Sequence, residues 1–150
     1  KKNLIIKNSS FDNIVFLHDY IILSDGWYGG HLKSGNDFDI RMDIILNADG
    51  TRFRDWCLWP DNQVSDGTST EDLIKSSALL PYEINNLSKF QYISGSYWVA
   101  KKTIMEEYPL NEDLLWGESE DVEWSKRVRL HYTFTMNTKS STSALILGTM

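Results

Sequence analysis

Six carboxylates crowd the segment between Tyr108 and Arg129, which passes a Trp-Gly pair and then becomes helical in pattern. Glu118, Glu120 and Asp121 lie so close along the chain that their mutual repulsion costs free energy, with no evident return in folding. A carboxylate at a loop-to-helix junction is well placed to take a proton from a substrate. An ordinary surface helix with charges matched to its dipole explains the same residues. The segment is therefore a candidate site, to be weighed with the others. The six residues are Glu112, Asp113, Glu118, Glu120, Asp121 and Glu123.

The helix that carries these residues is predicted to begin at Ser119, a good N-cap residue, after the flexible Gly117. Trp124 and Val128 are four residues apart and therefore share one face of that helix. Acidic residues then occupy the first turn, and basic residues occupy the last. The element positions Glu120 and Asp121 at its N-terminal end.

A second candidate site follows the apolar segment Ile14–Leu17, which predicts a strand buried on both faces. His18 and Asp19 come directly after it, at the end of a strand where open α/β sheets bind ligands. A carboxylate and an imidazole suit Mg²⁺ or Mn²⁺, and His131 could supply a further ligand. The alternatives are a strand end that is merely solvated and a histidine with a structural role.

Weaker candidates are the turn Ser94–Ser96 and the tryptophans. Backbone N–H groups around Gly95 and Ser96 could bind an anionic ligand, although a plain turn explains them equally well. Trp27, Trp98 and Trp116 could stack on a sugar ring, but a place in the core is the default for each of them.

Composition indicates one globular domain over residues 1–150. The chain is 41% hydrophobic, 24% charged and 13% aromatic, with a net charge of −6. That charge argues against nucleic-acid partners and against attraction to anionic membranes. The single cysteine, Cys57, excludes an intrachain disulfide and fits a reducing, cytoplasmic location. No apolar run approaches the roughly 20 residues of a membrane span, and the first seven residues are too polar for a signal peptide.

The remaining elements predict an α/β fold. Alternating residues in Phe38–Ile45 predict a strand that forms an antiparallel hairpin with Thr51–Trp59. The Ser/Thr-rich segment Asn137–Ser143 is expected to be a mobile tail. Other expected elements are a helix or strand at Asn3–Asn8, helices at Thr70–Leu80 and Lys101–Glu107, and strands at Phe90–Ile93, Tyr97–Ala100 and Tyr132–Met136.

Taken in order, these segments resemble the GT-A glycosyltransferases, in particular those like family 2. Ile14–Tyr20 is similar to the strand of that family that ends in a DxD motif. Ser94–Lys102 resembles its glycine-bearing strand before a basic pair. Leu110–Val128 resembles its "DE…G-x-E-D-v-E…R" segment, which is the most specific match. The resemblance covers about residues 1–136.

The resemblance implies a partial GT-A, Rossmann-like mixed sheet flanked by helices, with the hairpin inserted. It implies inverting transfer of a sugar from a nucleotide-sugar donor to a carbohydrate or other hydroxyl acceptor. Asp121 corresponds to the general base, and Glu120 beside it contacts donor or acceptor hydroxyls. A divalent cation, Mn²⁺ or Mg²⁺, at Asp19 would offset charge on the departing diphosphate. Donor or acceptor contacts are expected from Gly95, Ser96, Trp98, Trp116 and Glu118.

Two features differ from the family pattern. His18 and Tyr20 flank Asp19 where further aspartates are usual, so His18 could replace a metal ligand or the cation could bind through water. Only about a dozen residues precede Ile14, where the family has its nucleotide-binding half, and the first residue is not Met. We therefore expect these residues to be the catalytic and acceptor-side part of a longer enzyme, inactive as an isolated fragment.

Two other functions are alternatives to a glycosyltransferase. One is a carbohydrate-binding module without catalysis, and the other is a metal-dependent hydrolase.

Overall fold

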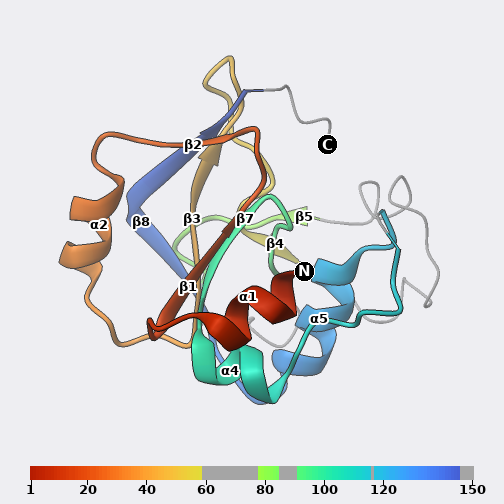
Figure 1. Cartoon of the computed structure of the whole chain (residues 1–150). Coiled ribbons are helices and arrows are strands. Elements are labelled where there is room, and N and C mark those ends of the chain that lie inside the picture. Colours follow the sequence, from red (N-terminus) through yellow and green to blue (C-terminus); the bar gives the residue numbers. More distant parts are fainter. Residues whose placement is uncertain (59–77, 85–90, 116, 146–150) are drawn as a thin grey trace.

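The computed structural model describes residues 1–58, 78–84, 91–115 and 117–145. A five-stranded mixed sheet forms its centre, with the strands in the order β1-β7-β3-β8-β2. Helix α2 covers one face of the sheet, and α1, α4 and α5 lie together on the other side (Figure 1). The described part is thus a mixed α/β structure. The helices are α1 (Lys2–Asn8), α2 (Trp27–Ser34), α4 (Lys102–Glu107) and α5 (Glu120–Val128), and the strands are β1 (Asn13–Leu17), β2 (Ile21–Leu23), β3 (Ile40–Leu46), β4 (Cys57–Leu58), β5 (Ala78–Leu79), β6 (Gln91–Tyr92), β7 (Tyr97–Lys101) and β8 (Phe134–Ala144).

Strand β7 separates two apolar clusters because its side chains alternate between the faces of the sheet. Trp98 and Ala100 join the larger cluster, which is built with α1, α4 and α5. Tyr97 and Val99 join a smaller cluster on the side of α2. Trp98 stacks on Phe16, with 4.0 Å between ring centroids, so β7 is fixed firmly to its neighbour β1.

Strand β1 was predicted correctly as a strand but not in its burial. It lies at an edge of the sheet and pairs antiparallel with β7. Ile14 and Phe16 are buried, whereas Leu17 is 47% exposed. The prediction of burial on both faces is therefore wrong, because an apolar run does not tell an edge strand from a central one.

The predicted hairpin is reduced to a short contact. Leu46 and Arg52 form one antiparallel bridge, and Phe53 N–H donates to the Ile45 carbonyl at 2.8 Å. The pairing ends there because the Asp55 carboxylate, and not a backbone carbonyl, accepts the Ile45 N–H at 3.1 Å. Strand β4 then joins a separate three-stranded antiparallel sheet, in the order β5-β4-β6.

The Ser/Thr-rich segment 137–143 belongs to β8, so the prediction of a mobile tail is wrong. Strand β8 lies inside the sheet, parallel to β3 and antiparallel to β2. Two of its hydroxyl side chains are paired with the α2 side: the buried Ser140 donates from Oγ to the Trp27 carbonyl at 3.0 Å, and Ser141 contacts Ser24. Small side chains here let helix α2 lie close to the strand.

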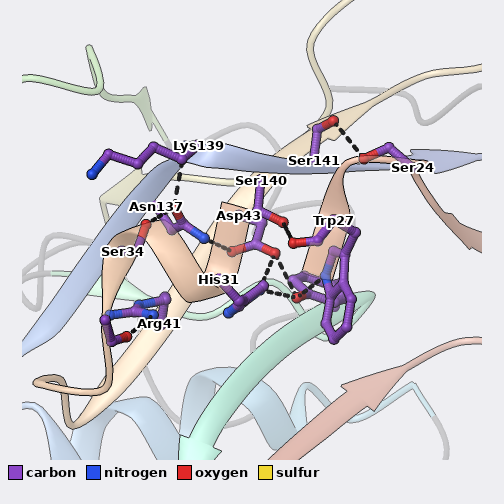
Figure 2. Close-up of polar contacts among 12 residues, drawn as sticks. Ser24, Trp27, His31, Ser34, Arg41, Asp43, Asn137, Lys139, Ser140 and Ser141 are labelled. Atoms are coloured by element: carbon purple, nitrogen blue, oxygen red, sulfur yellow. Dashed lines mark hydrogen bonds and ion pairs between the residues drawn. The ribbon is translucent and has the colours of Figure 1, made fainter. Parts of the chain in front are cut away.

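A buried carboxylate holds α2, β3, β7 and β8 together (Figure 2). Asp43, which is fully buried, accepts hydrogen bonds from Tyr97 Oη at 2.6 Å and Asn137 Nδ2 at 3.0 Å. His31 Nε2 lies 2.7 Å from the same carboxylate, and Trp27 Nε1 donates to Tyr97 Oη at 2.7 Å. Such a network replaces the water that the carboxylate loses on burial.

The other expected elements are found with altered bounds. Asn3–Asn8, expected to be a helix or a strand, belongs to helix α1. Helices α4 and α5 occur as predicted. Most of the helix expected at Thr70–Leu80 lies outside the described residues, and its last part is strand β5. No helix in the described part of the chain is long and apolar enough to cross a membrane.

The contact between α2 and β8 gives a test of this packing. A Cβ atom on Gly30 would lie 2.1 Å from the Lys139 carbonyl oxygen, whereas one on Gly29 meets nothing within 4 Å. Gly30→Ala should therefore lower the free energy of unfolding by about 1–3 kcal/mol, the usual cost of overpacking. Gly29→Ala, the matched control in the same helix, should be neutral or raise it by about 0.5–1 kcal/mol. Urea unfolding of both variants would measure this, and equal stabilities would contradict the packing.

Candidate functional site

An open cleft of about 840 Å³ joins the two regions that the sequence singled out. The turn after β1 contributes His18 and Tyr20, and the start of α5 contributes Glu120 and Asp121. The loop between β6 and β7 and the first residues of the chain complete it. The full lining is Lys1, Lys2, Asn3, His18, Tyr20, Arg54, Tyr92, Ser94, Gly95, Ser96, Leu110, Asn111, Glu112, Leu114, Leu115, Gly117, Ser119, Glu120, Asp121 and Val122.

Asp121 is held at the cleft by the backbone of the β6–β7 loop. Gly95 N–H donates to Asp121 Oδ2 at 2.8 Å. A Cβ atom on Gly95 would lie 2.9 Å from the same oxygen, so the absence of a side chain permits the close approach. The predicted anion-binding N–H of this turn is thus occupied by a carboxylate of the protein itself.

Helix α5 is anchored so that Asp121 keeps its place. Ser125 Oγ donates to the Asp121 carbonyl at 2.6 Å and accepts the buried Ile93 N–H at 3.0 Å. Trp124 is fully buried and donates from Nε1 to the Tyr108 carbonyl at 2.6 Å. Ser119 precedes the helix in the left-handed conformation, with φ 58°, and its side chain makes no capping bond. The predicted cap is therefore right in position and wrong in mechanism.

An aromatic pair forms another part of the lining. The rings of His18 and Tyr20 stack with centroids 5.2 Å apart and planes at 13°. Tyr20 Oη lies 2.8 Å from Ser96 Oγ, and His18 N–H donates to the Ser96 carbonyl at 3.0 Å. Ser96 therefore links the β1 turn to the loop that holds Asp121. Stacked flat rings beside hydroxyl groups suit a sugar or a base.

Charges of both signs line the cleft. Lys2 forms an ion pair with Glu120, and Asn3 donates to Glu112 at 3.1 Å. Burial lowers the pKa of Lys2, and the charge of Asp121 partly restores it. Arg54 adds a further positive charge at the same surface. The cleft thus combines proton-accepting groups with cations inside an acidic chain.

Burial also raises the pKa of Asp121 above its ordinary value of 3.8. The hydrogen bond from Gly95 and the positive charge of Arg54 act in the other direction. A carboxylate that is partly desolvated and aimed into a cleft is a stronger proton acceptor than one in water.

Other predicted site residues lie elsewhere. Trp98 is 1% exposed and packs in the core, so it makes no part of the lining. Glu118 is exposed, and its Oε2 accepts the Leu115 N–H at 2.6 Å, which closes a loop beside the cleft. Trp116 lies outside the described residues. Asp19 is exposed and does not line the cleft, whereas its neighbours do.

The three suggested metal ligands do not converge. His131 is exposed and stacks on Tyr108, with centroids 5.6 Å apart, away from His18 and Asp19. No group of three His, Cys, Asp or Glu side chains in residues 1–58, 78–84, 91–115 and 117–145 could hold a metal ion. Metal binding stays a prediction of the resemblance, with Asp19 as its carboxylate.

Sequence reasoning missed the cations of the cleft. No motif marks Lys2 or Arg54, although Arg54 lies in the expected return strand Thr51–Trp59. Only the packing of α1 and of the loop 47–56 brings them into the cleft with Asp121. Tyr92, on the short strand β6, was also missed. A lone basic residue carries no positional information in one sequence, so no feature of the chain would have identified them.

The raised pKa of Asp121 predicts how stability depends on pH. Between pH 3.8 and the higher native pKa, the folded protein binds this proton more tightly than the unfolded chain does. The contribution of Asp121 to stability therefore falls as pH rises through that window. Asp121→Asn should raise the free energy of unfolding at pH 7, and the gain should vanish below pH 3.8.

Urea unfolding at several pH values would measure this effect, with Asp113→Asn on an exposed loop as the control. A variant that is less stable than the native protein at pH 7 would show that the charged carboxylate stabilises the fold.

Comparison with known proteins adds no family: no protein-family model matches the chain, and no curated protein matches its sequence.

Proposed function

We propose that the chain is the catalytic part of an inverting glycosyltransferase that moves a sugar from a nucleotide-sugar donor to an acceptor hydroxyl. The observation that carries the proposal is the cleft that Asp121 shares with His18 and Tyr20. The resemblance requires Asp19 itself to meet Asp121 across a pocket. The two neighbours of Asp19, about a hundred positions before Asp121, line the cleft, whereas Asp19 does not. The meeting of this turn with Asp121 supports the proposal because the acceptor-side base and the donor-side strand end must face one substrate pair.

In the proposed step, Asp121 takes the proton of the acceptor hydroxyl as its oxygen attacks the anomeric carbon. The bond from that carbon to the nucleotide diphosphate breaks, and the diphosphate leaves with the electron pair. Gly95 N–H holds Asp121 Oδ2, which leaves the second carboxylate oxygen to accept the proton of the acceptor hydroxyl. Asp121 is therefore the catalytic base in this proposal.

The surrounding residues bind and orient in this scheme. Glu120, held by Lys2, accepts hydrogen bonds from substrate hydroxyls. The His18–Tyr20 rings provide a stacking surface, and the hydroxyl of Ser96 lies beside them. A divalent cation, if bound at Asp19, would supply positive charge to the diphosphate. No step here depends on it.

A second candidate is a carbohydrate-binding module without catalysis, favoured by the stacked His18–Tyr20 pair and Tyr92 in the same cleft. It needs no proton acceptor, so Asp121→Asn would leave glycan binding unchanged. Loss of binding on Trp116→Ala, with sugar transfer absent in the native protein, would favour this module.

The transferase proposal predicts a specific loss of activity. In the complete enzyme, Asp121→Asn should lower the rate of sugar transfer by roughly 10²–10⁴-fold, the usual contribution of a general base. Glu123→Gln is the matched control, because Glu123 lies in the same helical turn and pairs with Arg127 at 2.6 Å. That variant should keep native activity. The rate of both variants is measured as the release of nucleotide diphosphate from the donor in the presence of the acceptor. An active Asp121→Asn variant would exclude Asp121 as the base.

A further inference from the structure

Arg54 brings a positive charge into the cleft that no described carboxylate neutralises. It lies on the loop 47–56, between β3 and β4, and lines the cleft together with Asp121. Its guanidinium forms no hydrogen bond or ion pair with any residue that the structure describes, and its Nε–H is buried. A buried N–H without a partner is destabilising, and more so when the group is charged. Within the described chain, the guanidinium therefore lacks a counter-charge.

The carboxylates around Arg54 have other partners. Asp55, the next residue, is fully buried and accepts bonds from Arg52 Nε at 2.8 Å and Tyr82 Oη at 2.7 Å. The carboxylates in the lining are also engaged: Glu112 with Asn3, Glu120 with Lys2, and Asp121 with the Gly95 N–H. A carboxylate or phosphate of a bound molecule would supply the missing charge, because a guanidinium binds either group through two parallel N–H bonds.

Arg54 belongs to the same wall of the cleft as Asp121. Three residues after Arg54, Cys57 on β4 pairs with Tyr92 on β6. Both of these residues pack in one buried cluster with Val122, which directly follows Asp121 on α5. The loop that carries Arg54 is thus joined to the start of α5 by packing. The turn after β1 forms a different part of the lining.

This placement indicates which substrate Arg54 meets. In a single displacement, the acceptor oxygen and the leaving diphosphate lie on opposite sides of the anomeric carbon, and the base lies on the side of the acceptor. A cation on the wall of Asp121 is therefore on the acceptor side. The resemblance assigns the diphosphate to the turn after β1, at Asp19.

We propose that Arg54 binds an anionic group of the acceptor, so that the acceptor is an acidic sugar with a carboxylate or phosphate group. The assignment to the acceptor rests on the transferase function proposed above. The binding of an anion by Arg54 does not, because it follows from the unpartnered guanidinium and the cleft alone.

The direct test uses three probes that differ only at the sixth carbon of one sugar ring: methyl β-glucoside, its 6-phosphate and methyl β-glucuronoside. NMR titration of the whole chain would measure their affinities and the shift of the Arg54 Nε–H signal, assigned from Arg54→Lys. At least one acidic probe should bind about tenfold more tightly than the neutral one, as expected for a charge-assisted pair, and should shift that signal. Equal affinities, or an unmoved Nε–H signal, would overturn the proposal without any variant.

Variants then assign the preference to this side chain. Arg54→Met should remove the preference for the acidic probe, and Arg54→Lys should keep part of it, because lysine retains the charge but not the planar pair of donors. Arg54→Gln is a second neutral replacement if the methionine variant does not fold. Lys33→Met, which removes an exposed charge on α2, should keep the full preference. A preference that survives in a folded, neutral Arg54 variant would reject Arg54 as the anion-binding residue.

Inorganic pyrophosphate tests the other source of an anion, the leaving group of the donor. It should compete poorly with the acidic sugar at Arg54. Pyrophosphate that binds more tightly than both acidic probes, and loses its affinity in Arg54→Met, would place the diphosphate at Arg54 and overturn the assignment to the acceptor.

Kinetics in the complete enzyme separates this proposal from the function on which it rests. Arg54→Met should raise KM for an acidic acceptor about tenfold and leave KM for the donor unchanged. A raised KM for the donor alone would overturn the assignment to the acceptor. An anion preference that depends on Arg54, in a protein that transfers no sugar, would keep the anion site but reject the transferase and the acceptor with it.

Discussion

The hydrogen bond from Gly95 N–H to Asp121 joins the two halves of the cleft, and the other features of the site depend on it. It requires a glycine, because any side chain at position 95 would meet the carboxylate. It also requires that α5 begin at a fixed point, which Ser125 ensures through the carbonyl of Asp121 and the N–H of Ile93. The same loop continues into β7 and reaches Tyr97, whose hydroxyl is bound by the buried Asp43. Packing on both faces of the sheet therefore fixes the carboxylate.

Unfavourable electrostatic interactions are concentrated around Asp121, the proposed catalytic base. Asp121 is desolvated, and other carboxylates lie beside it on α5. Asp43 on the other face shows the contrast: it is fully buried, but donors from α2, β7 and β8 surround it. A carboxylate that serves the fold is saturated with hydrogen bonds, whereas one that serves a reaction keeps capacity for a substrate.

Local patterns in the sequence predicted the parts of the structure that local physics decides. The start of α5 after Ser119 and the strand before His18 were predicted from local residue types, although Ser119 makes no capping bond. The rest depends on tertiary contacts. Segment 137–143 reads as polar and mobile until its neighbours in the sheet are known. Trp98 is of a residue type that often binds sugars, but it lies in the core. Arg54 reaches the cleft only because the buried Asp55 turns its loop. Such outcomes are fixed by distant partners, which a single sequence does not reveal.

The stereochemistry of the product tests the central claim most directly. If Asp121 deprotonates an acceptor that displaces the diphosphate in one step, the new glycosidic bond must have the anomeric configuration opposite to that of the donor. Proton NMR of the anomeric signal during the first turnovers of the complete enzyme measures this without a variant. Inversion is the predicted result. A product that retains the donor configuration would contradict single displacement and the role of Asp121 as its base.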